Sequence, residues 1–313
     1  MKKLLQFGPL FVIIAALLWS FDGILRISLY SLPPSVVVFY EHLLGFLVLL
    51  IFSLRWLKDL KNMTKKEWLA VIIIALFSGA LGTIFYTAAL QKINYTQYSV
   101  VVLLQQQLQP IWAISTAAIL LKEKLSKNFL AWAALALFAA YFITFKDLRV
   151  NLSTGAETIL AGLLSLAAGF MWGTSTAVSK FVLKKVSFLT GTALRFFFAP
   201  LFALIFIVGQ NQTSSLFSLN NSQWITLLVI TLSTGMIAVI FYYYGLKKTP
   251  ARITTICELV WPASAIFIDY FLFHKTLSLT QILGITLLIL AIYKITKPLK
   301  NKLGVSAEEF SRS

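Results

Sequence analysis

Long apolar runs separated by short polar and basic segments dominate this chain. Ten of these runs come close to the roughly 20 residues that a helix needs to cross a bilayer. Each run is expected to be helical, because lipid offers no hydrogen-bond partners to an open backbone. The predicted spans are 8–30, 34–55, 67–90, 96–121, 128–146, 157–183, 187–209, 223–246, 250–273 and 278–296.

The first run follows a short basic start and has the outline of a secretory signal peptide. No small-x-small cleavage site follows it, and the same segment has a counterpart later in the chain. We therefore interpret 8–30 as the first membrane span.

The amino-acid composition also indicates a membrane protein. Hydrophobic residues make up 59% of the chain and charged residues only 12%, with a mean hydropathy of +0.84. Soluble domains carry about 25% charged residues, so a soluble enzyme and a disordered protein are both excluded. The prediction is an all-α integral membrane protein whose first partner is the lipid bilayer.

The net charge of +16 does not indicate nucleic acid as a partner, because the Lys and Arg residues lie in short clusters between the apolar runs. With the N-terminus placed inside, cytoplasmic segments and the helix ends beside them hold 21 of the 27 Lys and Arg residues, the outer segments and helix ends hold five, and the remaining one is Arg195, inside a span. The positive-inside rule then predicts that both termini are cytoplasmic, in a multi-pass protein of the cell (inner or plasma) membrane.

The two halves of the chain resemble each other. Segment 68–86 recurs at 224–242, and segment 110–126 recurs at 262–278. The offset stays between 152 and 156 residues. Each copy holds five spans, and because five is odd, the second copy must be inverted in the membrane.

We therefore predict a first five-helix repeat over 1–150, an inverted second repeat over 151–297, and a polar cytoplasmic tail over 298–313. Inverted repeats are a transporter architecture, with the substrate site near the membrane midplane between the repeats. A duplicated membrane scaffold that transports nothing is the structural alternative.

Three short motifs recur in order in both halves. They are a tryptophan followed by a small residue (Trp19-Ser20, Trp172-Gly173), a closing Ala88-Ala89-Leu90 or Tyr244-Gly245-Leu246, and a mid-span proline (Pro110, Pro262). With these motifs the chain resembles, over residues 8–297, the EamA-type transporters of the drug/metabolite transporter superfamily.

The resemblance implies ten helices around a cavity that opens alternately to either side, with no cofactor. It implies export or uptake of amino acids or other small metabolites, and protons as a candidate coupling ion. Arg195 supplies the arginine that the family commonly has in its second span, where the first half has Glu41-His42 instead. A monomer and a homodimer both remain open.

Ionisable residues inside the spans are candidate functional groups, because each costs roughly 2.5–3.5 kcal/mol to insert near the bilayer centre. Arg195 and Glu258 are predicted at one level of the inner half. They form either a structural ion pair or part of the substrate site.

Asp22 and Glu41 are predicted at one level of the outer half, with His42 beside them. These three residues are candidates for proton coupling, because burial can bring a carboxyl group into the neutral range. Arg26 lies one helical turn from Asp22, so a local salt bridge is the competing explanation. For His42 the alternative is a packed, hydrogen-bonded histidine.

Gln106 and Glu258 each precede a mid-span proline by one turn, where the helix is weakened. Aromatic residues are candidates to line the cavity and stack on a ligand, although packing is the common role of such residues. The predicted substrate-binding residues are Trp19, Gln106, Trp172, Arg195, Tyr242, Glu258 and Trp261, and Tyr86 is a further aromatic candidate.

A cavity that offers both signs of charge suits a zwitterionic or mixed polar and apolar solute. The predicted function is a secondary transporter, an exporter of amino acids or similar small polar metabolites. Multidrug and nucleotide-sugar carriers are alternatives. An intramembrane enzyme is not favoured, since the chain has two histidines for a metal site and no G-x-S-x-G motif.

Overall fold

The computed structural model describes residues 7–51, 58–61, 63–93, 98–144, 156–274 and 276–309. These residues form helices and turns and contain no strand. The first half holds α2 (Gly8–Trp19), α3 (Asp22–Arg26), η1 (Ile27–Leu29), α4 (Pro34–Leu50), α6 (Lys65–Ile74), η2 (Ala75–Leu81), α7 (Gly82–Lys92), α8 (Tyr98–Leu120) and α9 (Lys127–Thr144). The second half holds α10 (Ala156–Leu183), α11 (Phe188–Gly209), η4 (Thr213–Phe217), α12 (Asn221–Ile230), η5 (Thr231–Gly235), α13 (Met236–Lys248), α14 (Ala251–Glu258), α15 (Val260–Phe273) and α16 (Leu279–Glu309).

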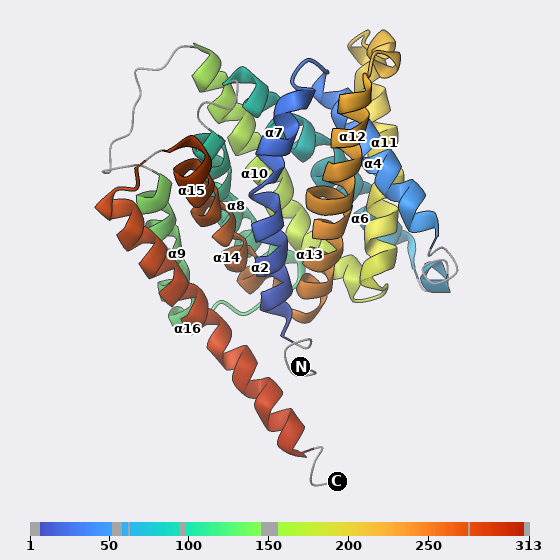
Figure 1. Cartoon of the computed structure of the whole chain (residues 1–313). Helices are drawn as coiled ribbons and strands as arrows, with labels where there is room; N and C mark the ends of the chain where they lie inside the picture. The colour runs from blue at the N-terminus through green and yellow to red at the C-terminus, as the bar shows by residue number, and fades with distance from the viewer. Residues whose placement is uncertain are drawn as a thin grey trace.

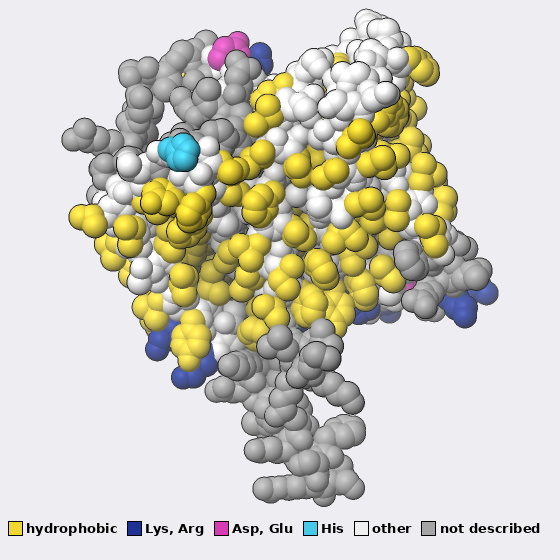
Figure 2. All heavy atoms as spheres, viewed as in Figure 1, with side chains coloured by type: hydrophobic (Ala, Val, Ile, Leu, Met, Phe, Trp, Pro, Cys, Tyr) yellow, Lys and Arg dark blue, Asp and Glu magenta, His cyan; other side chains and the backbone are white. Residues whose placement is uncertain are grey.

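Helices long and apolar enough to cross a membrane make up most of this fold. Seven candidate spans are present among the described residues, together with three shorter apolar helices, Pro34–Leu50, Leu108–Leu120 and Lys127–Ile143. Figure 2 shows hydrophobic side chains across the middle of one face, with most of the visible Lys and Arg side chains below them. The predicted all-α integral membrane protein is confirmed.

The helix ends differ in places from the predicted bounds. α4 ends at Leu50, before the predicted 55, and residues 52–57 lie outside the described part of the chain. α16 continues to Glu309 and so extends into the segment predicted as a polar tail. In Figure 1 the start of α2 and the end of α16 lie at the same end of the bundle.

The third run of each half starts with the same capping arrangement. Thr64 and Glu67 form a capping box before α6, and Asn220 and Gln223 form one before α12. The backbone N–H of Thr64 donates to Glu67 at 2.8 Å, and that of Asn220 donates to Gln223 at 2.9 Å. Both boxes supply partners for amide groups that a helix start leaves unpaired.

The same run is interrupted by a π-helical segment in both halves, η2 and η5. A π-segment inserts an extra residue per turn and is frequent at functional sites. These segments carry Ser78 and Thr234, which contact the charged groups of Arg195 and Asp22, and Thr231, whose hydroxyl donates to the backbone carbonyl oxygen of Glu41 at 3.3 Å.

The two halves interlock. α2 packs on α13, α4 on α11, and α10 on both α7 and α8 (Figure 1). α2 and α13 approach closely, since a Cβ atom on Gly245 would lie 2.8 Å from the carbonyl oxygen of Gly8. This packing leaves a cavity between the halves.

Candidate functional site

The cavity gathers side chains from both halves of the chain. Of the ten predicted site residues, nine line it: Trp19, Asp22, Glu41, His42, Trp172, Arg195, Tyr242, Glu258 and Trp261. The side chain of the tenth, Gln106, lies outside the described residues. Gln109, one turn further along α8, lines the cavity.

Five aromatic rings form one wall, the aromatic wall. The ring centroid of Trp19 lies 5.2 Å from that of Tyr242 and 5.7 Å from that of Trp261. Tyr86 lies 5.5 Å from Trp172 and 5.7 Å from Trp261. Trp172 and Trp261 are 5.9 Å apart. These separations lie in the range of favourable aromatic contacts, so the rings form one continuous apolar surface beside the cavity.

Glu258 is held by uncharged partners. Its Oε2 accepts a 2.6 Å hydrogen bond from Nε2 of Gln109, and its Oε1 accepts a 2.9 Å bond from the hydroxyl of Tyr242. Thr176 lies 2.9 Å from the same tyrosine hydroxyl. Among the described residues Glu258 forms no ion pair, so its position depends on this hydrogen-bond network.

α14 ends at Glu258 and α15 begins at Val260, with a turn at Leu259. This break lies one turn before Pro262, whose ring cannot accommodate a regular helical bond to residue 258. α8, in contrast, is continuous through Pro110.

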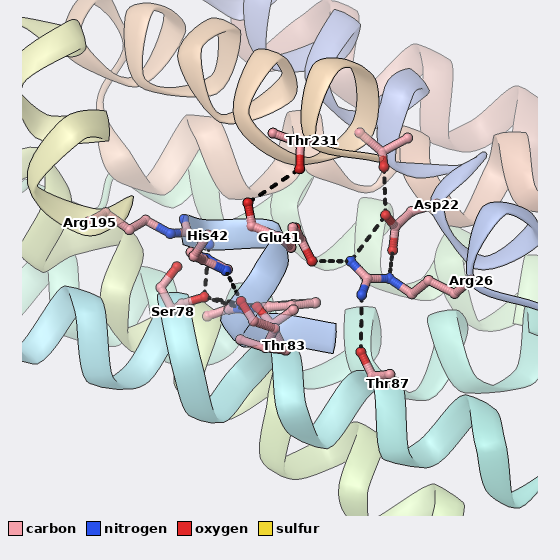
Figure 3. A network of polar contacts seen from close by, with 12 residues as sticks. Asp22, Arg26, Glu41, His42, Ser78, Thr83, Thr87, Arg195 and Thr231 are labelled. Carbon is pink, nitrogen blue, oxygen red and sulfur yellow. Dashed lines mark hydrogen bonds and ion pairs between the residues drawn. The ribbon is translucent and has the colours of Figure 1, made fainter. Parts of the chain in front are cut away.

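A second network surrounds Arg26 (Figure 3). The guanidinium contacts both oxygens of Asp22, with Nη2–Oδ1 at 3.2 Å, and its Nη2 lies 2.8 Å from Oε2 of Glu41. Nη1 donates to Thr87 at 3.3 Å. Thr234 donates to Oδ1 of Asp22 at 2.6 Å. One buried cation, Arg26, therefore lies between two buried carboxylates. The salt bridge between Asp22 and Arg26, which the sequence offered as an alternative to proton coupling, is part of this network.

Arg195 lies apart from this network. Its Nη2 donates at 2.8 Å to the carbonyl oxygen of Ser78 in η2. The same oxygen accepts a 3.1 Å bond from Nε1 of Trp172. In the described part of the chain no carboxylate pairs with Arg195, so the ion pair with Glu258, one of the two sequence interpretations, is absent there.

Glu41 and His42 point in different directions, as their adjacency on a helix requires. Glu41 faces Arg26, and His42 lies on the side of Arg195 (Figure 3). The ring of His42 stacks on Phe196 at 4.6 Å and 29°, and its Nδ1 lies 3.0 Å from the carbonyl oxygen of Val38.

The site residues predicted from the sequence do not include Ser78, Thr87, Gln109 and Thr234. Gln109 belongs to a glutamine-rich stretch whose polarity was a usable signal. The carbonyl of Ser78 and the hydroxyl of Thr234 belong to the π-segments and contact Arg195 and Asp22. No simple residue pattern reveals a π-segment.

Charged groups join the halves again at the end of α8. Glu123 accepts hydrogen bonds from the backbone N–H groups of Ala251 at 2.8 Å and Arg252 at 3.1 Å. Its Oε2 also pairs with Nη1 of Arg252 at 3.1 Å. Glu123 therefore ties the end of α8 to the first turn of α14.

A cavity with aromatic and polar lining, enclosed by two interlocked halves of apolar helices, defines a membrane protein that handles a small solute. The chain belongs to the EamA-like transporter family, whose model matches residues 6–145 and 159–297. It is therefore a membrane transporter, and the family resemblance seen in the sequence is confirmed.

Relatives that are named as transporters cover almost the whole chain. The riboflavin transporter ImpX of Fusobacterium nucleatum is 36% identical over 292 residues, which is 93% of this chain and 97% of the relative. An uncharacterized transporter of Archaeoglobus fulgidus is 25% identical over 278 residues, 88% of this chain and 93% of the relative.

A solved crystal structure shares the fold. It superposes with a TM-score of 0.71 at 17% sequence identity, over 92% of this chain and 97% of the other.

Proposed function

We propose that this transporter carries riboflavin, or another planar heteroaromatic solute with polar substituents, by alternating access. The aromatic wall carries the proposal, because planar rings stack favourably on aromatic side chains. The ring centroid of Trp261 lies 5.7 Å from that of Trp19 and 5.9 Å from that of Trp172. The 36% identity to a riboflavin transporter supports the same class of substrate.

The polar groups around this wall suit a solute with several donors and acceptors. Glu258 and Gln109 lie on one part of the cavity, and Arg195 with Ser78 on another. A ring system can stack on the wall while its polar substituents replace water at these groups. Such an arrangement is typical of ligand sites, where a few polar groups fix the orientation of a mostly apolar contact.

An amino acid or similar small polar metabolite is the second candidate. Arg195 and Glu258 line the same cavity and form no ion pair among the described residues. A zwitterion would place its carboxylate on the first and its ammonium group on the second. The two candidates differ in whether transport depends on the aromatic wall.

In the proposed topology all ten helical runs cross the cell membrane, and both termini face the cytoplasm. The three shorter apolar helices then complete the seven longer spans. The basic clusters of the sequence and the common end of α2 and α16 in Figure 1 support this orientation. In this topology Glu123 and Arg252 tie α8 to α14 at the cytoplasmic end, and a movement of the two halves that opens this end would break their contact.

We further propose that Asp22 and Glu41 take part in proton coupling. One guanidinium, that of Arg26, balances only one of these two buried carboxylates. Binding of one proton would bring the net charge of Asp22, Arg26 and Glu41 together to zero. Release of that proton would restore one negative charge, which favours access to water.

Uptake into proteoliposomes tests the substrate proposal. Riboflavin and a pool of labelled amino acids are supplied in separate reactions, with and without a pH gradient, to protein inserted in both orientations. Saturable riboflavin uptake is the expected result, and the pH gradient should change it in the wild type but not in Asp22→Asn. Uptake of an amino acid without riboflavin would favour the second candidate.

A pair of tryptophan variants tests the role of the aromatic wall. Trp19→Leu should weaken riboflavin binding about three- to tenfold, in line with the 0.5–1.5 kcal/mol of an aromatic contact. Trp112→Leu is the matched control, because Trp112 is 40% exposed and packs on Phe170. Equal effects of both variants would contradict the proposal.

A further inference from the structure

Several residues that line the cavity have a buried polar atom without a hydrogen-bond partner in the part of the chain that the structure describes. They are Nε of Arg195, Nε2 of His42, Oγ of Ser175 and Nε1 of Trp261. Buried polar groups are normally paired, and an unpaired one costs about 1–3 kcal/mol. Four such atoms around one cavity indicate groups that a ligand satisfies.

The unpaired atom of His42 can be assigned as an acceptor. Nδ1 lies 3.0 Å from the carbonyl oxygen of Val38, and a carbonyl oxygen only accepts. Nδ1 therefore carries the hydrogen atom. In the neutral ring Nε2 then presents a lone pair.

The unpaired atom of Arg195 is a donor. Every nitrogen of a guanidinium carries hydrogen, and Nη2 is already bonded to Ser78 at 2.8 Å. Because the Nη2 bond holds the guanidinium in place, it also fixes the direction of the Nε–H group. Arg195 is 8% exposed and His42 1% exposed, so water satisfies neither atom from bulk solvent.

Local packing keeps these two groups together. His42 stacks on Phe196, the residue after Arg195 in α11. Figure 3 shows Arg195 and His42 on the same side of α4, away from Arg26. Among the described residues, Arg195 and His42 thus leave one donor and one acceptor without a partner beside the cavity, which is complementary to a ligand edge with one acceptor and one donor.

We propose that Arg195 and His42 form a subsite for an amide-like edge, a C=O group next to an N–H group in a planar ring. The C=O accepts from Nε–H of Arg195, and the N–H donates to Nε2 of His42. Lactams and cyclic imides carry this edge, including the imide of the riboflavin ring. The inference rests on the proposed function, since it assigns the polar end of a ring that stacks on the aromatic wall.

The subsite also gives a reason for specificity. A site that provides a buried acceptor for an N–H group strongly rejects an analogue without that N–H, because its own acceptor stays unpaired. Methylation of the ring nitrogen removes the donor while the stacking surface stays the same. The site should therefore discriminate between a cyclic imide and its N-methyl derivative.

Equilibrium dialysis with the purified full chain in detergent tests this subsite. The probes are riboflavin and uridine, each compared with its derivative methylated on the imide nitrogen. The wild type should bind riboflavin at least tenfold more tightly than the methylated flavin. His42→Phe keeps a ring against Phe196 but lacks the acceptor, so the ratio should fall to within about twofold.

Two further variants separate the roles. Arg195→Lys should weaken the binding of both flavins, because both carry the C=O group and the substitution removes the Nε–H group that donates to it. His274→Asn is the control for histidine substitution, since His274 is exposed and has a φ of 52°, which Asn tolerates. This control should keep the wild-type ratio.

The outcomes distinguish the subsite from the proposed function. If the wild type binds both flavins equally, or if His42→Phe keeps the wild-type ratio, the subsite is overturned while riboflavin binding stands. If riboflavin does not bind but uridine binds more tightly than its methylated form, the subsite stands and the proposed substrate does not. Preference for the phosphate ester of riboflavin, lost in Arg195→Lys, would overturn the imide in favour of an anion. If neither ring binds, both proposals fail.

Discussion

Gln109, from the first half of the chain, donates a 2.6 Å hydrogen bond to Glu258, from the second half. Gln109 belongs to the continuous helix α8, and Glu258 is the last residue of α14, next to the helix break at Leu259. Their bond joins the two repeats inside the cavity. A movement of α8 relative to α14 would change this contact.

Substitution Glu258→Gln should reduce transport about tenfold or more while the fold is kept. The amide has the shape of the carboxyl group but offers one acceptor in place of two, so the bonds from Gln109 and Tyr242 cannot both be retained. Initial uptake rates measure the effect. Glu157→Gln is the control, because the Glu157 side chain is 65% exposed; similar losses in both variants would contradict a specific role.

Removal of the Arg26 guanidinium should be strongly destabilising. Arg26→Met leaves Asp22 and Glu41 as two buried carboxylates without their cation, and breaking a buried pair in this way costs about 3–5 kcal/mol. Thermal unfolding in detergent measures the loss. The triple variant with Asp22→Asn and Glu41→Gln should regain most of it, and no recovery would show that the carboxylates are not the cause.

Close packing of α2 on α13 should tolerate no side chain at Gly245. A Cβ atom there would lie 2.8 Å from both the Gly8 carbonyl oxygen and Cγ2 of Val12. Overpacking of this kind costs about 1–3 kcal/mol, so Gly245→Ala should lower the melting temperature. Gly209→Ala is the matched control, with nothing within 4 Å of the added atom, and it should be neutral or slightly stabilising.

The start of α11 should respond to acid through Asp59, which lies between α4 and α6. Its Oδ2 accepts 2.6 Å bonds from the N–H of Ser187 and the hydroxyl of Thr190. Burial opposes ionisation, but the bonds from Thr190 and Ser187 outweigh it and lower the pKa of Asp59 below its ordinary value.

Because the pKa of Asp59 is lower in the folded state, its stabilisation is present above about pH 4, the unfolded value, and is lost as the pH falls through the folded pKa. Asp59→Asn should cost about 1 kcal/mol at neutral pH, as loss of a cap does. Melting curves over a pH series measure the difference from wild type. A difference that persists unchanged in acid would contradict this assignment.

The sequence predicted most of the charged and aromatic residues that line the cavity, because charges and aromatic residues inside apolar spans stand out against their neighbours. Asp22, Glu41, Arg195 and Glu258 are examples. Apart from Arg26, which the sequence offered as a salt-bridge partner of Asp22, their partners did not follow. Levels along helices suggested Arg195 beside Glu258, but depth says nothing about which face of a helix a side chain occupies or which helices are neighbours.

By itself the sequence determined the class of this protein, its apolar helices and its repeat. These depend on local periodicity and on the high free-energy cost of placing charges or unpaired backbone groups in lipid. Only the tertiary structure decided the contacts. The π-segments direct the Ser78 carbonyl at Arg195 and the Thr234 hydroxyl at Asp22. Such pairings depend on how helices far apart in the chain rotate and pack against each other, and this rotation is fixed by the packing of the whole bundle.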